Sequence, residues 1–465
     1  MKRVVLKKIE WPDFGHAEPL PPPTVQELQS RMKQCRIAMS RRGLSHLIVY
    51  ADREHFANLC YLTYFDPRFE EALMIINRDT EFPLVVVGNE CVGHLNISPL
   101  LQSGQLRYER YQPFSLLNQP RDESRPLKRI FESEGIRKDS TVGCVGWKYF
   151  SEQEFDNPET ILDLPAYLAD TLRSLAGKVL NVTDLFMAPS YGLRATCTPY
   201  EIAVFEFSNV MASEGMKNVL KHFKAGVPDF ELVQHYQYTG YPLSCHIGMK
   251  SSGNLHYGLS SPTGSEVRRG DPCSTGIAYW GSNICRAGWV AADKVDLPEA
   301  ARDYVENFAA PYFLACDAWL EHLRIGVPGG ELQRIIDEAL PYDQFGVFLN
   351  PGHLIHLDEW LSSPIYRGST EILRSGMYLQ TDIIPRSAVY SSSRMEDGLV
   401  LADAALQQEL ARQYPTTYAR CLSRREFIRQ TIGITLSEDV LPLSNTFGLV
   451  PPYFLDYRTI LTIQS

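Results

Sequence analysis

The sequence has no paired-cysteine spacing, no long apolar run and no excess of positive charge. Its ten cysteines are scattered without a CxxC pair, so we expect reduced thiols rather than disulfides or a structural zinc site. No segment reaches the roughly 18 consecutive apolar residues that span a bilayer. The net charge is −10, which repels a phosphate backbone or an anionic membrane surface. The sequence therefore predicts a cytoplasmic protein that binds neither nucleic acid nor membrane.

One targeting signal and one cofactor signal are also not found in the sequence. The N-terminal apolar run ends at Leu6, which is too short for a secretory signal. No GxGxxG fingerprint occurs, so nothing indicates a dinucleotide site. What is present is the composition of a folded protein, with 44% hydrophobic and 22% charged residues. A chain of 465 residues is long enough for two or three domains, each with its own core.

The first part of the chain alternates helical and strand patterns. A helical pattern covers about residues 24–42 and ends at Gly43. Apolar runs typical of strands follow, at residues 46–50, 72–77, 84–88 and 141–146. This alternation predicts an α/β domain over residues 1–190.

A strong helix start opens the second part. Thr198 is placed to cap, Pro199 occupies the first helical position, and Glu201 completes a capping box. The helix is expected to run to about Lys224, before Gly226. We therefore place the domain boundary within residues 187–198 and assign residues 191–465 to a second domain.

The second domain contains an internal repeat. The segment GVPDFEL at residues 226–232 recurs as GVPGGEL at residues 326–332. Each copy precedes a strand-like segment, at residues 266–270 and 371–376. We infer two α/β halves related by pseudo-two-fold symmetry, with a site at their junction.

Candidate catalytic groups lie in polar segments of this domain. Histidine suits acid/base work and metal ligation because its ordinary pKa is near 6.5. His353 directly follows Gly352, and His256 lies in a polar segment that contains glycine. Asp382 and Glu396 are carboxylates set among apolar residues, where a charged group needs a partner. The alternatives are that the histidines are structural and that Glu396 forms a salt bridge with Arg394.

Taken together, these motifs resemble the pita-bread family of creatinase, prolidase, aminopeptidase P and methionine aminopeptidase. The resemblance rests on the repeat, on Gly352-His353, on GM at residues 376–377 before DIIP at 382–385, and on MED at 395–397. The segments YADR at 50–53 and FDPRFE at 65–70 are similar to the N-terminal domain of creatinase and prolidase. The resemblance implies an α/β, two-domain creatinase-like architecture whose C-terminal domain is the pita-bread domain with the pseudo-two-fold repeat.

The peptidases of this family bind two divalent metals through two aspartates, a histidine and two glutamates. By this resemblance, His353 matches the histidine and Glu396 the last glutamate, while Asp382 stands at the first glutamate. The two aspartate positions fall on Gly276 and Asn283, neither of which is acidic.

The loss does not depend on the alignment, because no aspartate or glutamate occurs between Asp271 and Asp293. The remaining set has too few ligands and charges for two hard divalent ions. We therefore expect no metal and no other cofactor. The alternative is a single divalent metal on His353, Asp382 and Glu396.

Creatinase is the family precedent for a metal-free site. By resemblance, His256 is the general acid/base that activates water and protonates the leaving nitrogen. His353 donates a hydrogen bond, and Asp382 and Glu396 hold a cationic group of the substrate. The resemblance thus implies metal-independent hydrolysis of a C–N bond in a small amino-acid-like, guanidino or amide substrate.

Three further residues are assigned to substrate binding. Arg68 lies where creatinase-like proteins reach across a dimer to a substrate carboxylate, so a homodimer is expected. Asn283 and Trp360 occupy two other family site positions.

Two other functions remain open. One is a metal-dependent Xaa-Pro peptidase, in which His356 adds a fourth ligand. The other is a non-catalytic protein that keeps the pita-bread fold for binding, as some such domains in larger assemblies do. We interpret Asp358-Glu359 as a solvated turn.

Overall fold

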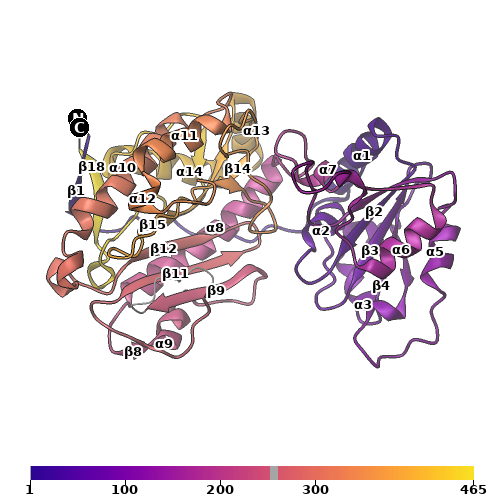
Figure 1. The fold of residues 1–465 in the computed structure, drawn as a ribbon, viewed down its shortest axis with the longest axis horizontal. Helices are drawn as coiled ribbons and strands as arrows, with labels where there is room; N and C mark the ends of the chain where they lie inside the picture. Colours follow the sequence, from indigo (N-terminus) through magenta and orange to yellow (C-terminus); the bar gives the residue numbers. More distant parts are fainter. Residues whose placement is uncertain (1, 252–259, 465) are drawn as a thin grey trace. The chain divides into compact units, whose positions relative to one another are not determined.

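The computed structural model describes residues 2–251 and 260–464 (Figure 1). The chain divides into two compact units, one of Pro21–Arg194 and one of Met1–Leu20 with Ala195–Ser465. The assignment of the first twenty residues to the N-terminal domain thus needs correction. Strand β1 (Arg3–Lys8) pairs antiparallel with β18 (Thr459–Gln464), so hydrogen bonding ties it to the C-terminal unit.

The N-terminal unit is a six-stranded mixed sheet with helices, in the order β5-β4-β3-β2-β6-β7. The strands are β2 (His46–Ala51), β3 (Ala72–Asn77), β4 (Leu84–Val87), β5 (Arg107–Arg110), β6 (Thr141–Val145) and β7 (Lys178–Asn181). The helices of at least seven residues are α1 (Val25–Arg41), α2 (Ala57–Thr63), α5 (Leu127–Ser133) and α6 (Ala166–Leu175). The predicted α/β class is confirmed, and Thr24 caps α1 through its side chain.

Two four-stranded sheets form the centre of the C-terminal unit. The first has the order β15-β12-β11-β9, with β9 (Leu243–Ser251), β11 (Pro272–Tyr279), β12 (Ile284–Trp289) and β15 (Arg394–Glu396). The second has the order β13-β14-β16-β17, with β13 (His353–Leu354), β14 (Tyr378–Gln380), β16 (Gly398–Leu401) and β17 (Val440–Pro442). All neighbouring strands within both sheets run antiparallel.

The principal helices of this unit are α8 (Pro199–Lys221), α10 (Ala310–His322), α11 (Gly329–Ala339), α13 (Ala404–Gln413) and α14 (Pro415–Phe427). Helix α8 begins with the expected capping box, in which Thr198 and Glu201 satisfy each other's backbone N–H groups. It packs on β11 and β12 and buries apolar side chains such as Ile202 and Phe205. Among the described residues, no helix has the length and apolar character needed to cross a bilayer.

The internal repeat is visible as equivalent backbone hydrogen bonds. Gly226 N–H donates to Val267 O at 2.7 Å, and Gly326 N–H donates to Leu373 O at 2.9 Å. Both glycines have a positive φ, of +83° and +91°, which explains why glycine occupies this position in each copy. The repeated sequence therefore folds into the same local structure twice.

Candidate active site

Four strands of the two central sheets bring the candidate residues together. Asn283 directly precedes β12, and Glu396 on β15 lies opposite Cys285 of β12. In the other sheet, His353 on β13 lies opposite Gln380 of β14, and Asp382 follows two residues after β14. The pairing of short strands thus collects side chains from positions more than 100 residues apart.

The centre of the site is a cation supplied by the protein itself. The Nη2 atom of Arg394 lies 2.9 Å from Asp382 Oδ1 and 2.8 Å from Glu396 Oε2. The alternative that Glu396 forms a salt bridge with Arg394 is confirmed. Burial lowers the pKa of Arg394, but Glu396 and Asp382 raise it well above its ordinary value, so the guanidinium remains charged.

Glu359 belongs to this site, so its assignment to a solvated turn is wrong. Asn283 Nδ2 donates to Glu359 Oε1 at 3.1 Å and to Glu396 Oε1 at 2.7 Å. The Glu359 side chain is only 26% exposed, and Oε1 lies 3.5 Å from His353 Nε2. Burial, followed by the charge of Asp382, raises the pKa of Glu359 to about 7. A carboxyl with this pKa can exchange protons near neutral pH.

His353 is fully buried, with one ring nitrogen available to the site. Its Nδ1–H donates to the Leu354 carbonyl at 3.1 Å, and the Trp360 ring stacks on the imidazole at a centroid distance of 4.0 Å. Burial lowers the pKa of His353, which favours the neutral ring. In that tautomer Nε2 is an acceptor rather than the predicted donor, and it makes no hydrogen bond within the described residues.

A second buried polar group lies beside His353. Gln380 is opposite His353 in the β13–β14 ladder, so the two side chains project from the same face of the sheet. Gln380 is fully buried, and its amide oxygen and nitrogen make no hydrogen bond within the described residues. Buried polar groups of this kind are expected to bind water or a ligand.

His356 does not add a ligand to this site. Its Nε2 lies 3.2 Å from Glu201 Oε1, and its ring meets Phe205 edge-on at 4.9 Å. Together with Cys197, these donors form a second buried cluster at the start of α8. The fourth-ligand role considered for His356 is therefore wrong.

The described contacts of this site include neither of two further predicted residues. His256 lies outside the described residues, so its role remains a prediction. Arg68 belongs to the N-terminal unit, where its Nε lies 3.3 Å from Asp66 Oδ1 and its side chain is 49% exposed. Arg68 also has a positive φ of 55°, an uncommon conformation for a residue other than glycine.

The residues present do not fit a two-metal centre. A Cβ atom on Gly276 would lie 2.3 Å from Cys285 Sγ, so an aspartate there would require the Cys285 side chain to move. Asn283 supplies an amide where the resemblance implies the other aspartate. The donors that do converge are His353, Glu359 and Glu396, whose ligand atoms all lie within 4.8 Å of one another. Asp382 is outside that group and pairs with Arg394.

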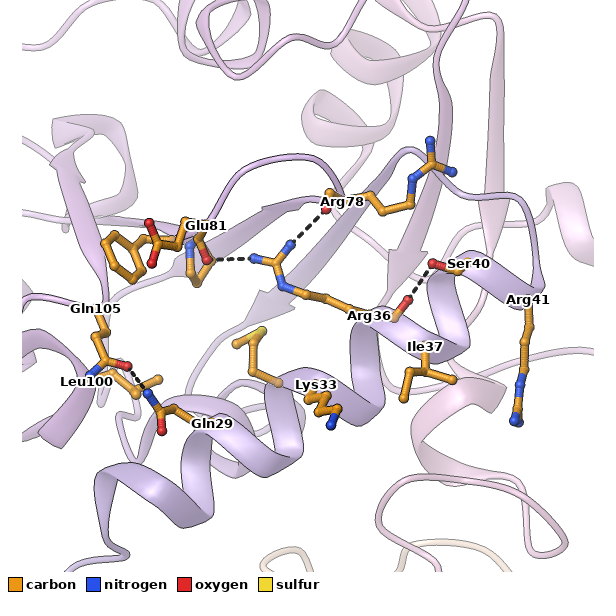
Figure 2. A pocket seen from close by; sticks show the side chains of 13 residues that line it. Gln29, Lys33, Arg36, Ile37, Ser40, Arg41, Arg78, Glu81, Leu100 and Gln105 are labelled. Carbon is orange, nitrogen blue, oxygen red and sulfur yellow. Dashed lines mark hydrogen bonds between the residues drawn. The ribbon is translucent and has the colours of Figure 1, made fainter.

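A surface groove beside α1 is a weaker candidate for a functional site. It has a volume of about 750 Å³ and lies between α1, the β3–β4 turn and the segment around Leu100 (Figure 2). Its polar side chains largely serve one another: Arg36 donates to three backbone carbonyls, and Gln29 donates to Gln105 at 2.6 Å. These polar side chains of the groove therefore already have hydrogen-bond partners within the protein. The buried polar groups around His353 make no such bonds within the described residues.

The raised pKa of Glu359 predicts a pH dependence of stability. Between its ordinary pKa of 4.5 and its folded value of about 7, the folded protein binds more protons than the unfolded chain. The stabilisation from this group is complete below the ordinary pKa and is lost as the pH rises through the folded one. Unfolding in urea at about pH 5 and about pH 8 should show a smaller pH effect in Glu359→Gln than in the wild type. An equal effect in both would contradict the assignment.

Comparison with known proteins gives matches at the level of structure. No protein-family model and no curated protein matches the chain. A prolidase from Pyrococcus horikoshii OT3 is similar with a TM-score of 0.62 and 13% identity, over 80% of this chain and 95% of that chain. An Xaa-Pro dipeptidase from Bacillus anthracis gives a TM-score of 0.60 and 13% identity, over 81% and 96%.

The same fold also occurs in a protein with a different description. The N-terminal domain of FACT complex subunit SPT16 from Cicer arietinum has a TM-score of 0.58 and 14% identity, over 81% of this chain and 94% of that one. These likenesses extend over four fifths of the chain at low identity. The chain therefore has the two-domain α/β fold of the prolidases and Xaa-Pro dipeptidases, as the sequence motifs predicted.

Proposed function

We propose that this chain hydrolyses a C–N bond in a small amino-acid-like, guanidino or amide substrate without a bound metal. The observation that supports the proposal best is the Glu359 carboxyl, which has a pKa of about 7 and lies 3.5 Å from the neutral His353. The loss of carboxylates at Gly276 and Asn283 supports a reaction without a two-metal centre. Solved structures with this fold are named for the cleavage of dipeptides, which is also C–N hydrolysis.

In the proposed reaction Glu359 acts as the general base and then as the general acid. It accepts a proton from water, the water oxygen bonds to the scissile carbon, and the C–N bond breaks as the proton passes to the leaving nitrogen. His353 Nε2 accepts a hydrogen bond from the water or the substrate. Asn283 fixes the orientation of the Glu359 carboxyl through the 3.1 Å hydrogen bond. His256 is proposed as a second acid/base group.

A substrate screen tests this proposal. We expect the purified protein to hydrolyse at least one member of a panel of guanidino acids such as creatine, small amides and Xaa-Pro dipeptides, equally well with and without a chelator. His256→Ala should lower turnover by about 10²–10⁴-fold if this histidine transfers the proton. Activity that appears only after addition of a divalent metal would contradict the metal-free reaction.

The second candidate function is a peptidase with one divalent metal. It is favoured by the convergence of His353, Glu359 and Glu396 within 4.8 Å. These residues would hold the ion, which would act as a Lewis acid toward a peptide carbonyl when bound. The donor set differs from the predicted one, because Glu359 replaces Asp382. Loss of Xaa-Pro cleavage after chelation would favour this candidate.

The oligomeric state and the cellular location of the protein are also part of the proposal. We propose a homodimer, in which Arg68 reaches the partner's substrate, and a cytoplasmic location. Sedimentation of the purified protein tests the first expectation, and a monomer at micromolar concentration would contradict it. Turnover by Arg68→Ala tests the role of the Arg68 side chain. This substitution should affect KM more than kcat.

A further inference from the structure

Arg394 balances a group of buried carboxylates at the centre of the site. The side chains of Asp382 and Glu396 are 6% and 0% exposed, and that of Arg394 is 17% exposed. Buried carboxylates need a compensating cation, because their desolvation is costly. A single guanidinium nitrogen, Nη2, makes both contacts. One positive charge at one position therefore contacts both acids, although it can balance only one full negative charge.

We propose that Arg394 is a tethered cation that excludes divalent metals from this site, and that removing its charge creates a binding site for one Zn²⁺ ion. The inference rests on the proposed metal-free reaction and is incompatible with the one-metal peptidase. It concerns which cation the carboxylates hold, and it is tested without an activity assay.

The donors around Arg394 are suitable for zinc. His353 Nε2 is buried and makes no hydrogen bond within the described residues, so no existing hydrogen bond must break before it can ligate. It lies 3.5 Å from Glu359 Oε1. Two ligands of a tetrahedral zinc ion, each about 2.0–2.1 Å from the metal, are separated by roughly 3.3–3.4 Å. Glu396 is the third donor within reach.

The guanidinium opposes such an ion in two ways. It already lies 2.8 Å from Glu396 Oε2, on the carboxyl group that the ion would need, and it adds a positive charge close to the metal position. Arginine cannot relieve this repulsion by losing its proton, because its pKa lies far above neutral pH. The exclusion of divalent metals should therefore hold over the whole physiological pH range.

Two substitutions separate charge from shape. Arg394→Met removes the charge and keeps a long side chain, whereas Arg394→Lys keeps one cationic nitrogen. Each purified protein is incubated with ZnCl₂ and desalted, and zinc is measured per chain. We expect about one more equivalent in Arg394→Met than in the wild type and Arg394→Lys, corresponding to an affinity gain of at least about 10³-fold. Zinc should also raise the melting temperature of Arg394→Met selectively.

Zinc that binds at other sites is accounted for by a second variant. The double substitution Arg394→Met/Glu396→Gln should lose the additional equivalent, while cysteine and histidine sites elsewhere remain. Zinc at one equivalent in the wild type, lost in Glu396→Gln, would overturn the inference, as would a folded Arg394→Met that gains none. If Arg394→Met does not fold, Arg394→Gln gives the same test, and the wild-type measurement still separates the outcomes.

Discussion

Replacing Glu359 with glutamine is expected to lower kcat by about 10²–10⁴-fold, the usual contribution of a positioned acid/base group. The amide keeps the size of the side chain and can still bond to Asn283, but it cannot accept a proton from water. Because the change removes proton transfer rather than substrate contacts, KM should change much less than kcat. Steady-state kinetics on the substrate found in the screen measure both constants.

Two comparisons make this result specific. Glu338→Gln removes the charge of a glutamate on the exposed surface of α11, where its partner is Arg334, and should leave kcat unchanged. The pH profile of the wild type should show an ionisation near the pKa of about 7 assigned to Glu359, and it should be absent in any residual activity of Glu359→Gln. Full turnover by Glu359→Gln would rule out the proposed role and leave His256 as the remaining candidate base.

The largest loss of stability is expected from Glu206→Ala. Glu206 on α8 is fully buried and accepts hydrogen bonds from Arg420 Nε at 2.7 Å and from Arg424 Nη2 at 2.6 Å, both on α14. Removing the carboxylate leaves two guanidinium groups without their counter-charge, which is expected to cost about 3–5 kcal/mol. Urea unfolding monitored by circular dichroism gives the change in the free energy of unfolding.

The matched control is again on α11. Glu338→Ala removes the same side chain from an ion pair with Arg334 in which both partners are exposed. Solvent screens that pair, so no measurable loss of stability is expected. Equal losses for Glu206→Ala and Glu338→Ala would show that burial does not determine the effect.

Local sequence signals predicted much of the fold. The capping box of α8 requires residues only three positions apart, and the two GVP segments show their equivalence in the sequence itself. The salt bridge between Arg394 and Glu396 could also be predicted from the sequence, because side chains two residues apart share one face of a strand. In each case the relevant interaction lies within a short stretch of chain.

Glu359 shows what the sequence could not reveal. Its environment is created by Asn283, 76 residues away, and by His353 on β13. A polar pair beside a tryptophan is equally typical of a solvated turn, and only the tertiary arrangement distinguishes the two. The place of β1 was missed for the same reason, since its partner β18 is at the other end of the chain.

The pairing of β12 with β15 has a consequence for dividing the protein. Asn283 and β12 belong to the first half of the C-terminal unit, whereas Glu359, Arg394 and Glu396 belong to the second. A chain cut between the halves would leave each fragment with an unpaired strand edge and an incomplete set of site residues. Reassembly of the two fragments would restore the β12–β15 ladder and the site in one step, so the fold lends itself to fragment complementation with hydrolysis as the signal.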